Sequence, residues 1–234
     1  MKVSIIIPVY NEEQTIAKLI EKVKKASLPN GVSREIIIVN DGSTDQSKKI
    51  IKNEYLKDKS LKIYQMRINL GKGAAVRTGI SLARGEIILI QDADLELNPE
   101  EYSKLINPIL ANKTKVVFGS RFLSKNFHIP MRTILGNKLL TLFTNFLYGS
   151  SLTDMETAYK AARSEVFNGL GLRCVGFDFE PEVTARILQM GHRILEVPIS
   201  YNPRRKDEGK KISAKDGLDA VSTLIKVKLF PIRH

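Results

Sequence analysis

Five short runs of isoleucine, valine and leucine alternate with amphipathic segments in the first half of the chain, and this alternation constrains the fold most. The runs cover residues 3–8, 35–39, 61–66, 86–91 and 115–118. Between them, apolar residues recur every three or four positions, which predicts helices over 12–26, 44–55, 72–83 and 99–111. Near-continuous apolar strands that alternate with helices are typical of a mainly parallel sheet covered on both faces. We therefore predict an α/β fold, with Ser43 as the N-cap of the second helix.

The second half has a different pattern, with helices predicted over 134–147, 180–191 and 213–230 and strands over 157–162 and 193–200. In the first of these helices we expect one apolar side formed by Leu135, Leu139, Leu142, Phe143, Phe146 and Leu147. The last helix is amphipathic, with apolar residues at Leu218, Val221, Leu224, Ile225 and Leu229. The helices over 134–147 and 213–230 are each expected either to join the core or to lie on a membrane surface. For the last helix, a membrane-protein partner or a second copy of the chain is a further alternative.

The charge of the chain is positive and unevenly distributed. Its 234 residues, a length typical of one domain, carry 37 Lys and Arg against 25 Asp and Glu, a net charge of +12. Residues 1–100 contribute 16 − 13 = +3, and residues 101–234 contribute 21 − 12 = +9. A basic second half implies an anionic partner, which is a nucleic acid, a phosphorylated ligand or a membrane surface. The single cysteine, Cys174, excludes an internal disulfide and suits a reducing compartment.

No segment has the length and apolar character of a membrane span, which needs ~20 predominantly apolar residues. The longest run without charge, Leu139–Thr153, contains Thr, Asn, Ser and Gly. The apolar run at the N-terminus is short and contains Pro8, and no small-residue cleavage site follows it. We therefore expect a cytoplasmic protein, free or bound peripherally to the membrane.

Three short polar segments stand directly after the first, second and fourth predicted strands: Pro8–Glu12, Asn40–Asp45 and Gln91–Glu96. Ligands of open α/β sheets bind outside the carboxyl ends of the strands. The three segments are therefore expected to line one site.

The first two of these segments have both a functional and a structural interpretation. Pro8 is expected to end the first strand, Tyr10 to pack on a base, and Glu12 to lie at a helix start. Asp41 is placed to accept a hydrogen bond from a ribose hydroxyl or a base N–H. Turn and helix-cap chemistry accounts for the same residue types.

The third segment carries a more specific signal, because Asp92 and Asp94 are two residues apart after a buried strand. Two carboxylates placed together repel each other unless a cation neutralises them. Mg²⁺ or Mn²⁺ takes one or two carboxylates and completes its shell with phosphate oxygens and water. The pair therefore predicts a metal site, with Glu96 as a third ligand or just outside the ligand shell. The alternative is an ordinary acidic loop.

A glycine-containing turn, Asn69–Ala75, precedes the third predicted helix. Its backbone N–H groups and Lys72 are candidates to face a phosphate. The segment lacks the spacing of a Walker loop and of Gly-x-Gly-x-x-Gly. The alternative is a glycine turn before a helix of small residues packed on the sheet.

Taken in order, these segments resemble family 2 inverting glycosyltransferases of the GT-A fold. The segments are VSIIIPVYNEE, EIIIVNDGSTD, NLGKGAAVRTGI and GEIILIQDADLE, and DAD is similar to the metal-binding D-x-D motif of that family. The resemblance implies a GT-A nucleotide-binding fold with C-terminal amphipathic helices. Residues 1–122 would form the nucleotide-sugar half and residues 123–234 the acceptor half of one catalytic domain.

Later segments resemble the dolichyl-phosphate mannose and polyprenyl-phosphate glucose synthase group: VVFGSRF, LTDMETAYKAARSEVF, FDFEPEVTARILQMGHRILEVPISYNPR and EGKKI. This resemblance implies transfer of a hexose from UDP-glucose or GDP-mannose to a dolichyl or undecaprenyl phosphate. The chain has TDMETAYK where mannose synthases usually read closer to DPTSGFR, so the sugar is not fixed.

The resemblance also implies residue roles. The donor nucleotide and its diphosphate would contact Pro8, Tyr10, Glu12, Asp41, Lys72 and Asp92. The metal ion would be held by Asp92, Asp94 and Glu96. The acceptor phosphate would contact Arg121, Arg132, Arg204, Lys210 and Lys211. Catalytic roles would fall to Asp94 and Arg121, with Asp154 and Glu180 near the sugar. The alternatives are a strand-end surface arginine for Arg121, a helix-start residue for Arg132, a solvated loop for 204–211 and a turn cap for Asp154.

A phosphate acceptor explains why no general base is evident. A phosphate monoester carries about −1.5 to −2 charge at neutral pH and attacks without losing a proton to the enzyme. A family 2 enzyme acting on a sugar hydroxyl would instead need a base, for which Asp154 or Glu180 would serve. A nucleotidyltransferase would release pyrophosphate. Nucleic-acid binding is disfavoured because no aromatic RNA-binding set, helix-turn-helix or zinc module is visible.

Overall fold

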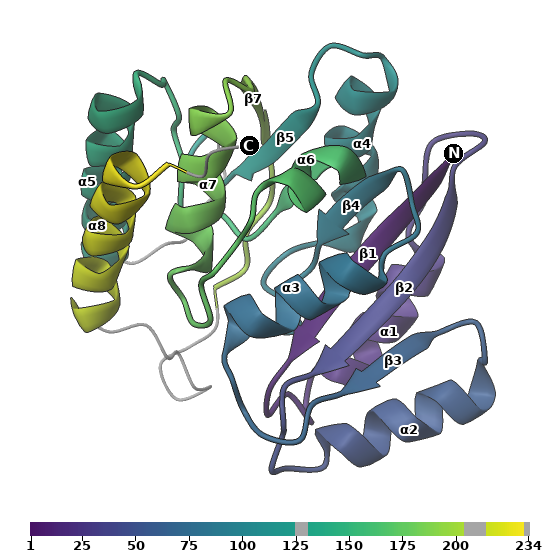
Figure 1. Ribbon diagram of the computed structural model, residues 1–234. Helices are drawn as coiled ribbons and strands as arrows, with labels where there is room; N and C mark the ends of the chain where they lie inside the picture. The colour runs from purple at the N-terminus through teal and green to yellow at the C-terminus, as the bar shows by residue number, and fades with distance from the viewer. Residues whose placement is uncertain (125–130, 204–213, 232–234) are drawn as a thin grey trace.

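The computed structural model describes residues 1–124, 131–203 and 214–231, and its centre is a seven-stranded sheet (Figure 1). The strand order is β3-β2-β1-β4-β6-β5-β7. The strands are β1 (Lys2–Val9), β2 (Ser33–Asn40), β3 (Lys62–Gln65), β4 (Ile87–Ile90), β5 (Val116–Ser120), β6 (Lys160–Arg163) and β7 (Ile194–Pro198). Only β6 is antiparallel to its neighbours β4 and β5, within the described residues. The predicted mainly parallel α/β sheet is confirmed.

Helices cover both faces of this sheet. They are α1 (Ile16–Lys25), α2 (Ser47–Lys57), α3 (Lys72–Leu82), η1 (Pro99–Glu101), α4 (Tyr102–Leu110), α5 (Met131–Tyr148), α6 (Ser164–Gly169), α7 (Phe179–Gln189) and α8 (Ala214–Leu229). Buried residues of α1, α2 and α4 join one face of the sheet, and those of α3, α6 and α7 join the other. The short helix α6 was not predicted from the sequence.

The prediction that Ser43 caps the second helix is wrong. Helix α2 begins at Ser47, and Gln46 is its N-cap residue. The Ser43 hydroxyl instead donates to Asn40 Oδ1 over 2.6 Å and accepts from the N–H of Asn11 over 3.1 Å. Because its hydroxyl joins the loops after β1 and β2, Ser43 stabilises the sheet edge rather than the helix.

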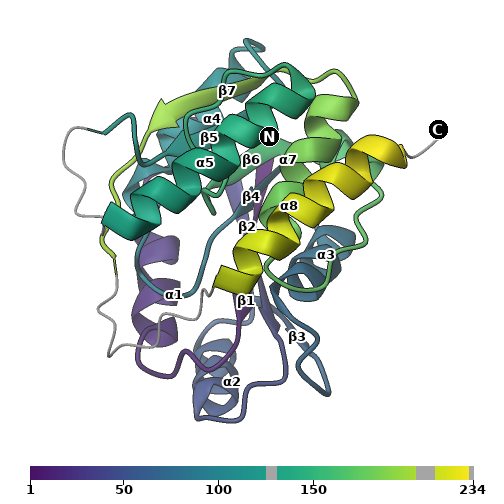
Figure 2. The ribbon, with the colours of Figure 1, turned by 90° about the vertical axis from the view of Figure 1, so that its left-hand side faces the viewer.

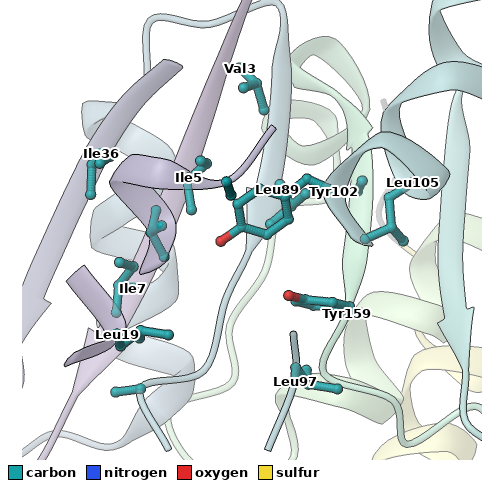
Figure 3. Close-up of a cluster of buried hydrophobic side chains, with 14 of the residues drawn as sticks. Val3, Ile5, Ile7, Leu19, Ile36, Leu89, Leu97, Tyr102, Leu105 and Tyr159 are labelled. Carbon is teal, nitrogen blue, oxygen red and sulfur yellow. The ribbon is translucent and has the colours of Figure 1, made fainter. Parts of the chain in front are cut away.

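The core beneath α1 and α4 contains two tyrosines whose polar atoms point to the end of β4. Tyr102 and Tyr159 are fully buried among the isoleucines and leucines of this cluster (Figure 3). Their hydroxyls both donate to Gln91 Oε1, over 2.9 Å and 2.7 Å. Buried tyrosine hydroxyls need such partners. The pair therefore fixes Gln91, the residue directly before Asp92.

Helices α5 and α8 form an outer layer against α7 (Figure 2). Leu224 and Val227 of α8 are buried in this contact, and Phe143 and Leu147 of α5 pack there. The Tyr148 hydroxyl also donates to the Leu224 carbonyl over 2.8 Å. The prediction that six apolar residues of α5 share one side is wrong, because Phe143 and Leu147 point to the contact.

Nine other apolar residues on these two helices or directly after α8 are exposed. On α5 they include Met131 and Phe146, exposed by 79% and 83%, together with Leu135, Leu139 and Leu142. On α8 and just after it they are Leu218, Ile225, Leu229 and Phe230. We call these nine side chains the apolar outer face. Among the helices of the described residues, none has the length and apolar character needed to cross a membrane.

Candidate active site

The ends of several strands bring the predicted site residues to one edge of the sheet. β1 is parallel to β2 and β4. Because β6 is antiparallel to both β4 and β5, β5 points in the same direction as β4. The loop after β4, the residues after β5 and the segment before β6 therefore meet at this edge. Asp92, Arg121 and Asp154 belong to these three segments.

The acidic loop after β4 is held in a tight turn. The Gln91 side-chain amide donates to the Asp92 carbonyl over 3.0 Å. Leu95 has a φ of 63°, so the chain turns sharply directly after Asp94. Asp94 Oδ1 accepts from the N–H of Glu96 over 3.1 Å. The two aspartates are therefore held close together on one partly buried turn.

Lys72, the first residue of α3, bridges two carboxylates of the site. Its Nζ lies 2.7 Å from Asp92 Oδ1 and 2.8 Å from Glu180 Oε1. Burial alone would lower the pKa of Lys72, but the two carboxylates outweigh burial and raise it. The ammonium group therefore stays charged. The bridge joins the acidic loop to the start of α7, which lies far away in the sequence.

Arg121, directly after β5, is bound to Asp154. Its Nε donates to Oδ2 and its Nη2 to Oδ1, both over 2.7 Å, and its backbone N–H also donates to Oδ2. Asp154 is fully buried and Arg121 nearly so. Burial would lower the pKa of Arg121, and the facing carboxylate raises it further than burial lowers it. Asp154 is thus a partner of Arg121, and the alternative of a simple turn cap does not describe it.

Glu196 on β7 binds the backbone of the segment that carries Asp154. This residue was not singled out from the sequence. Its carboxylate accepts from the backbone N–H groups of Thr153 and Asp154, over 2.7 Å and 2.9 Å. Burial raises the pKa of Glu196, although these bonds act against the rise. A glutamate inside an otherwise apolar strand was the available signal.

The loops after β1 and β2 are joined by hydrogen bonds. Strand β1 runs one residue beyond Pro8, so the prediction that Pro8 ends the strand is wrong. The N–H of Glu12 donates to Ser47 Oγ over 2.8 Å, and Glu12 Oε2 accepts from Thr15 Oγ1 over 2.9 Å. Pro8, Tyr10 and Glu12 are all partly exposed. Helix α1 begins at Ile16 with Thr15 as its N-cap residue, so the prediction that Glu12 lies at a helix start is wrong. Nucleotide contact by Pro8, Tyr10 and Glu12 stays a prediction.

Asp41 shapes a neighbouring loop. The N–H groups of Leu70 and Gly71 donate to Asp41 Oδ1 and Oδ2, each over 2.8 Å. Burial raises the pKa of Asp41, while these two bonds act in the opposite direction. The side chain is almost fully buried. Asp41 thus positions the turn before α3, and its contact with a nucleotide stays a prediction.

The expectation that backbone N–H groups of the turn 69–75 face a phosphate is wrong for Leu70, Gly71, Gly73 and Ala74. Besides the two bound by Asp41, the N–H of Gly73 donates to the Gly176 carbonyl over 3.2 Å, and that of Ala74 donates to Val175 over 3.1 Å. A Cβ on Gly71 would lie 2.3 Å from the Val175 carbonyl oxygen. The glycine is therefore needed for close packing of two backbone segments rather than for an anion.

The carboxylates of the acidic loop fit a hard divalent ion only in part. Glu96 Oε2 accepts from the Tyr201 hydroxyl over 2.7 Å. No three side chains of His, Cys, Asp or Glu converge as metal ligands anywhere in ranges 1–124, 131–203 and 214–231. Two aspartates on one turn nevertheless match an ion that takes the rest of its ligands from a diphosphate. Lys72 at contact distance shows that Asp92 accepts a positive charge here.

Two further residues were missed: Glu156, in the segment before β6, and Lys160, the first residue of β6. Lys160 is fully buried, donates to the carbonyls of Met155 and Thr157, and lies 4.6 Å above the ring of Phe118. Burial lowers the pKa of Lys160. Burial and, less strongly, the nearby carboxylate of Glu180 raise the pKa of Glu156 to about 7. Polar residues in the run DMETAYK were the available signal.

The remaining predicted acceptor residues are Arg132, Arg204, Lys210 and Lys211. Arg132 is the second residue of α5. Arg204, Lys210 and Lys211 lie outside the described residues. Their contact with an acceptor phosphate stays a prediction.

The model of the glycosyl transferase family 2 matches residues 4–171, well over half of the chain. The chain belongs to glycosyl transferase family 2. The resemblance drawn from the sequence motifs is thereby confirmed, and the protein is a glycosyltransferase by family.

Curated relatives of this glycosyltransferase carry related names at modest identity. One is a dolichyl-phosphate beta-glucosyltransferase of Trichomonas vaginalis, ALG5C, 31% identical over 94% of this chain and 70% of its own. Another is the polyprenol monophosphomannose synthase of Mycolicibacterium smegmatis, 28% identical over 98% of this chain and 86% of its own.

A solved structure shares the fold. Glucosyl-3-phosphoglycerate synthase from Mycobacterium tuberculosis, in complex with Mn²⁺, UDP and phosphoglyceric acid, matches with a TM-score of 0.74. The match covers 99% of this chain and 80% of that one at 19% identity. The predicted GT-A architecture is confirmed by this likeness.

Proposed function

We propose that this family 2 glycosyltransferase moves a hexose from a nucleotide sugar, UDP-glucose or GDP-mannose, to a polyprenyl phosphate with inversion at the anomeric carbon. One observation carries the proposal: a turn with two aspartates and a buried arginine stand at the same edge of the sheet. The first suits the donor diphosphate, and the second suits an anionic acceptor. The names of the curated relatives favour a polyprenyl or dolichyl phosphate as that acceptor.

Asp92 and Asp94 would hold Mg²⁺ or Mn²⁺ against the diphosphate. When bound, such an ion supplies Lewis-acid stabilisation of the leaving nucleoside diphosphate. Glu96 would support the turn through Tyr201 rather than bind the ion directly, because its carboxylate already accepts the tyrosine hydroxyl. Lys72 would add a positive charge beside the diphosphate, within reach of Asp92.

The chain's own residues would then orient the acceptor. Asp154 binds Nε and Nη2 of Arg121 and so fixes the plane of the guanidinium. The Nη1 edge would contact the acceptor phosphate and offset its charge. A phosphate at neutral pH needs no general base. Asp154 would therefore act as a positioning residue.

The alternative of a hydroxyl acceptor is less well supported. It requires a carboxylate as base, and of the two candidates drawn from the sequence, Asp154 is fully buried under three bonds from Arg121. Glu180 is paired to Lys72 through Oε1.

The lipid of the acceptor would keep the enzyme at a membrane surface, on the cytoplasmic side. The apolar outer face of α5 and α8 supports this, because it offers exposed leucines and phenylalanines beside Lys138, Lys226 and Lys228. Lys138 also lies 6.0 Å from the ring of Phe122, which neighbours Arg121. The outer face is thus continuous with the proposed acceptor side.

A donor screen tests the proposed function. The purified protein is incubated with labelled UDP-glucose or GDP-mannose and a polyprenyl phosphate, with and without chelator. We expect lipid-linked hexose and free nucleoside diphosphate with one donor, no product with chelator, and loss of activity in Asp94→Asn. Release of pyrophosphate, or equal transfer to a lipid-free sugar, would contradict the proposal.

A further inference from the structure

The segment Thr153–Thr157 is held in place through its backbone. Glu196 binds the N–H groups of Thr153 and Asp154, and Thr141 Oγ1 accepts from the N–H of Met155 over 3.1 Å. From the other side, buried Lys160 donates to the carbonyls of Met155 and Thr157. Such a network preorganises the side chains that the segment carries.

Three side-chain oxygens at this place have no hydrogen-bond partner within the described part of the chain. They are Glu156 Oε1, Thr157 Oγ1 and Glu180 Oε2, and all three atoms are buried. Thr157 is fully buried and Glu180 is 7% exposed. A buried polar atom without a partner costs roughly 1–3 kcal/mol. Because the backbone of this segment is otherwise well hydrogen-bonded, we take these oxygens as acceptors for a ligand.

Lys72 gives the position of one of these residues, Glu180, relative to the donor. Its ammonium contacts Asp92 on one side and Glu180 Oε1 on the other. Only the side chain of Lys72 therefore separates the Glu180 carboxylate from Asp92 at the proposed diphosphate site. In a nucleotide sugar, the group attached to the diphosphate is the sugar.

The chemistry of these oxygens selects the ligand class. Two are carboxylate oxygens, which accept hydrogen bonds and repel anions. A phosphate would therefore be disfavoured, whereas a ligand rich in O–H donors would be favoured. Burial and Glu180 raise the pKa of Glu156 to about 7, which agrees with a carboxylate that lacks a donor.

We propose that Glu156, Glu180 and Thr157 form the subsite that binds the hydroxyl groups of the donor hexose, with Glu156 as its selecting residue. The proposal rests on the proposed function and extends it from the diphosphate to the sugar. Lys160 is the positioning residue that fixes the segment from behind.

Calorimetric binding tests the subsite with two ligands that share a nucleotide. The nucleoside diphosphate and the corresponding nucleotide hexose identified by the donor screen are titrated with Mn²⁺ present into wild type, Glu156→Ala and Glu156→Gln. We expect Glu156→Ala to weaken nucleotide-hexose binding by about 10-fold to 100-fold and to leave nucleoside-diphosphate binding within about twofold. Glu156→Gln keeps an acceptor oxygen and is expected to recover part of the loss.

Glu100→Gln is the matched control, because Glu100 is exposed at the start of η1. It is expected to change neither affinity. Equal weakening of both ligands by Glu156→Ala would show a merely structural role and overturn the subsite, as would no change for either ligand. A wild type that binds the nucleoside diphosphate but transfers no hexose would instead contradict the proposed function. Wild type that binds neither ligand would overturn both.

Discussion

Arg121 and Asp154 form a bidentate ion pair, in which Nε and Nη2 each donate to one carboxylate oxygen over 2.7 Å. The pair joins the end of β5 to the segment before β6, and both side chains are buried. Charge-assisted bidentate pairs fix the plane of the guanidinium as well as its position. The pair thus orients the cation that we assign to the acceptor.

Asp154→Asn should destabilise the fold. The variant leaves a buried guanidinium without its counter-charge, and breaking such a pair costs about 3–5 kcal/mol. Urea unfolding at pH 7 measures the loss. Asp58→Asn removes an ion pair with Lys24 at the surface and serves as the control, with little change expected. Equal losses in both variants would contradict the buried role of Asp154.

Arg121→Ala should weaken use of the acceptor far more than binding of the donor. Its guanidinium stands on the β5 side of the site, away from the bridge of Lys72 to Asp92. Loss of a forked charge-assisted contact is expected to raise the KM for polyprenyl phosphate by about tenfold or more. Initial rates with one substrate varied at a time measure this. If donor affinity falls instead, Arg121 contacts the donor.

The parallel sheet followed from the alternation of strands and helices in the sequence, whereas a place for Arg121 in the site followed only from the family resemblance. The strand order then brings Asp92 and Arg121 to the same edge. The pairing of Lys72 with Asp92 and Glu180 did not follow. It depends on where α7 packs, and Glu180 lies 108 residues from Lys72.

Two predictions about which groups are accessible were wrong for a related reason. The N–H groups of Gly73 and Ala74 looked available in the sequence, but the distant segment 175–176 supplies their acceptors. Likewise, apolar spacing on α5 does not tell Phe143, which packs on α7 and α8, from exposed Phe146. A single helix pattern does not show how many neighbours the helix has.

Glu156 should make the stability of the protein fall as the pH rises. Its ordinary pKa is 4.5, and burial with Glu180 raises it to about 7 in the folded chain. Folding therefore favours the protonated form, and this contribution is present below about pH 4.5 and lost as the pH approaches 7. The loss of unfolding free energy from this titration is at most about 3 kcal/mol.

Urea unfolding of wild type and Glu156→Gln at pH 5 and pH 8 measures this contribution. The variant should gain stability relative to wild type at pH 8 and differ little at pH 5. Glu100→Gln should track wild type at both. A constant difference between wild type and Glu156→Gln across this range would show that Glu156 does not titrate there.

The apolar outer face should bind anionic membranes. Phe146→Ser and Leu142→Ser remove two of its exposed side chains. Buried apolar surface contributes roughly 25 cal/mol per Å², and each nearby basic residue adds about 1 kcal/mol. We expect the double variant to co-sediment with phosphatidylglycerol vesicles at least about tenfold more weakly than wild type. Leu56→Ser on α2 is the control, because Leu56 is exposed on a different helix. Unchanged vesicle binding with an altered oligomeric state would assign this face to a second copy.

Lys72→Met should increase the stabilisation that Mn²⁺ gives. The Lys72 ammonium lies 2.7 Å from Asp92 Oδ1 and so competes with a metal ion for that carboxylate. An ion that binds only the folded chain raises the melting temperature by mass action. The melting temperature with and without Mn²⁺, in the absence of nucleotide so that the proposed diphosphate contact of Lys72 does not enter, measures the effect. The shift should be larger in Lys72→Met than in wild type and should vanish in Asp94→Asn. A shift of equal size in all three proteins would mean that Mn²⁺ binds elsewhere than at the aspartate turn.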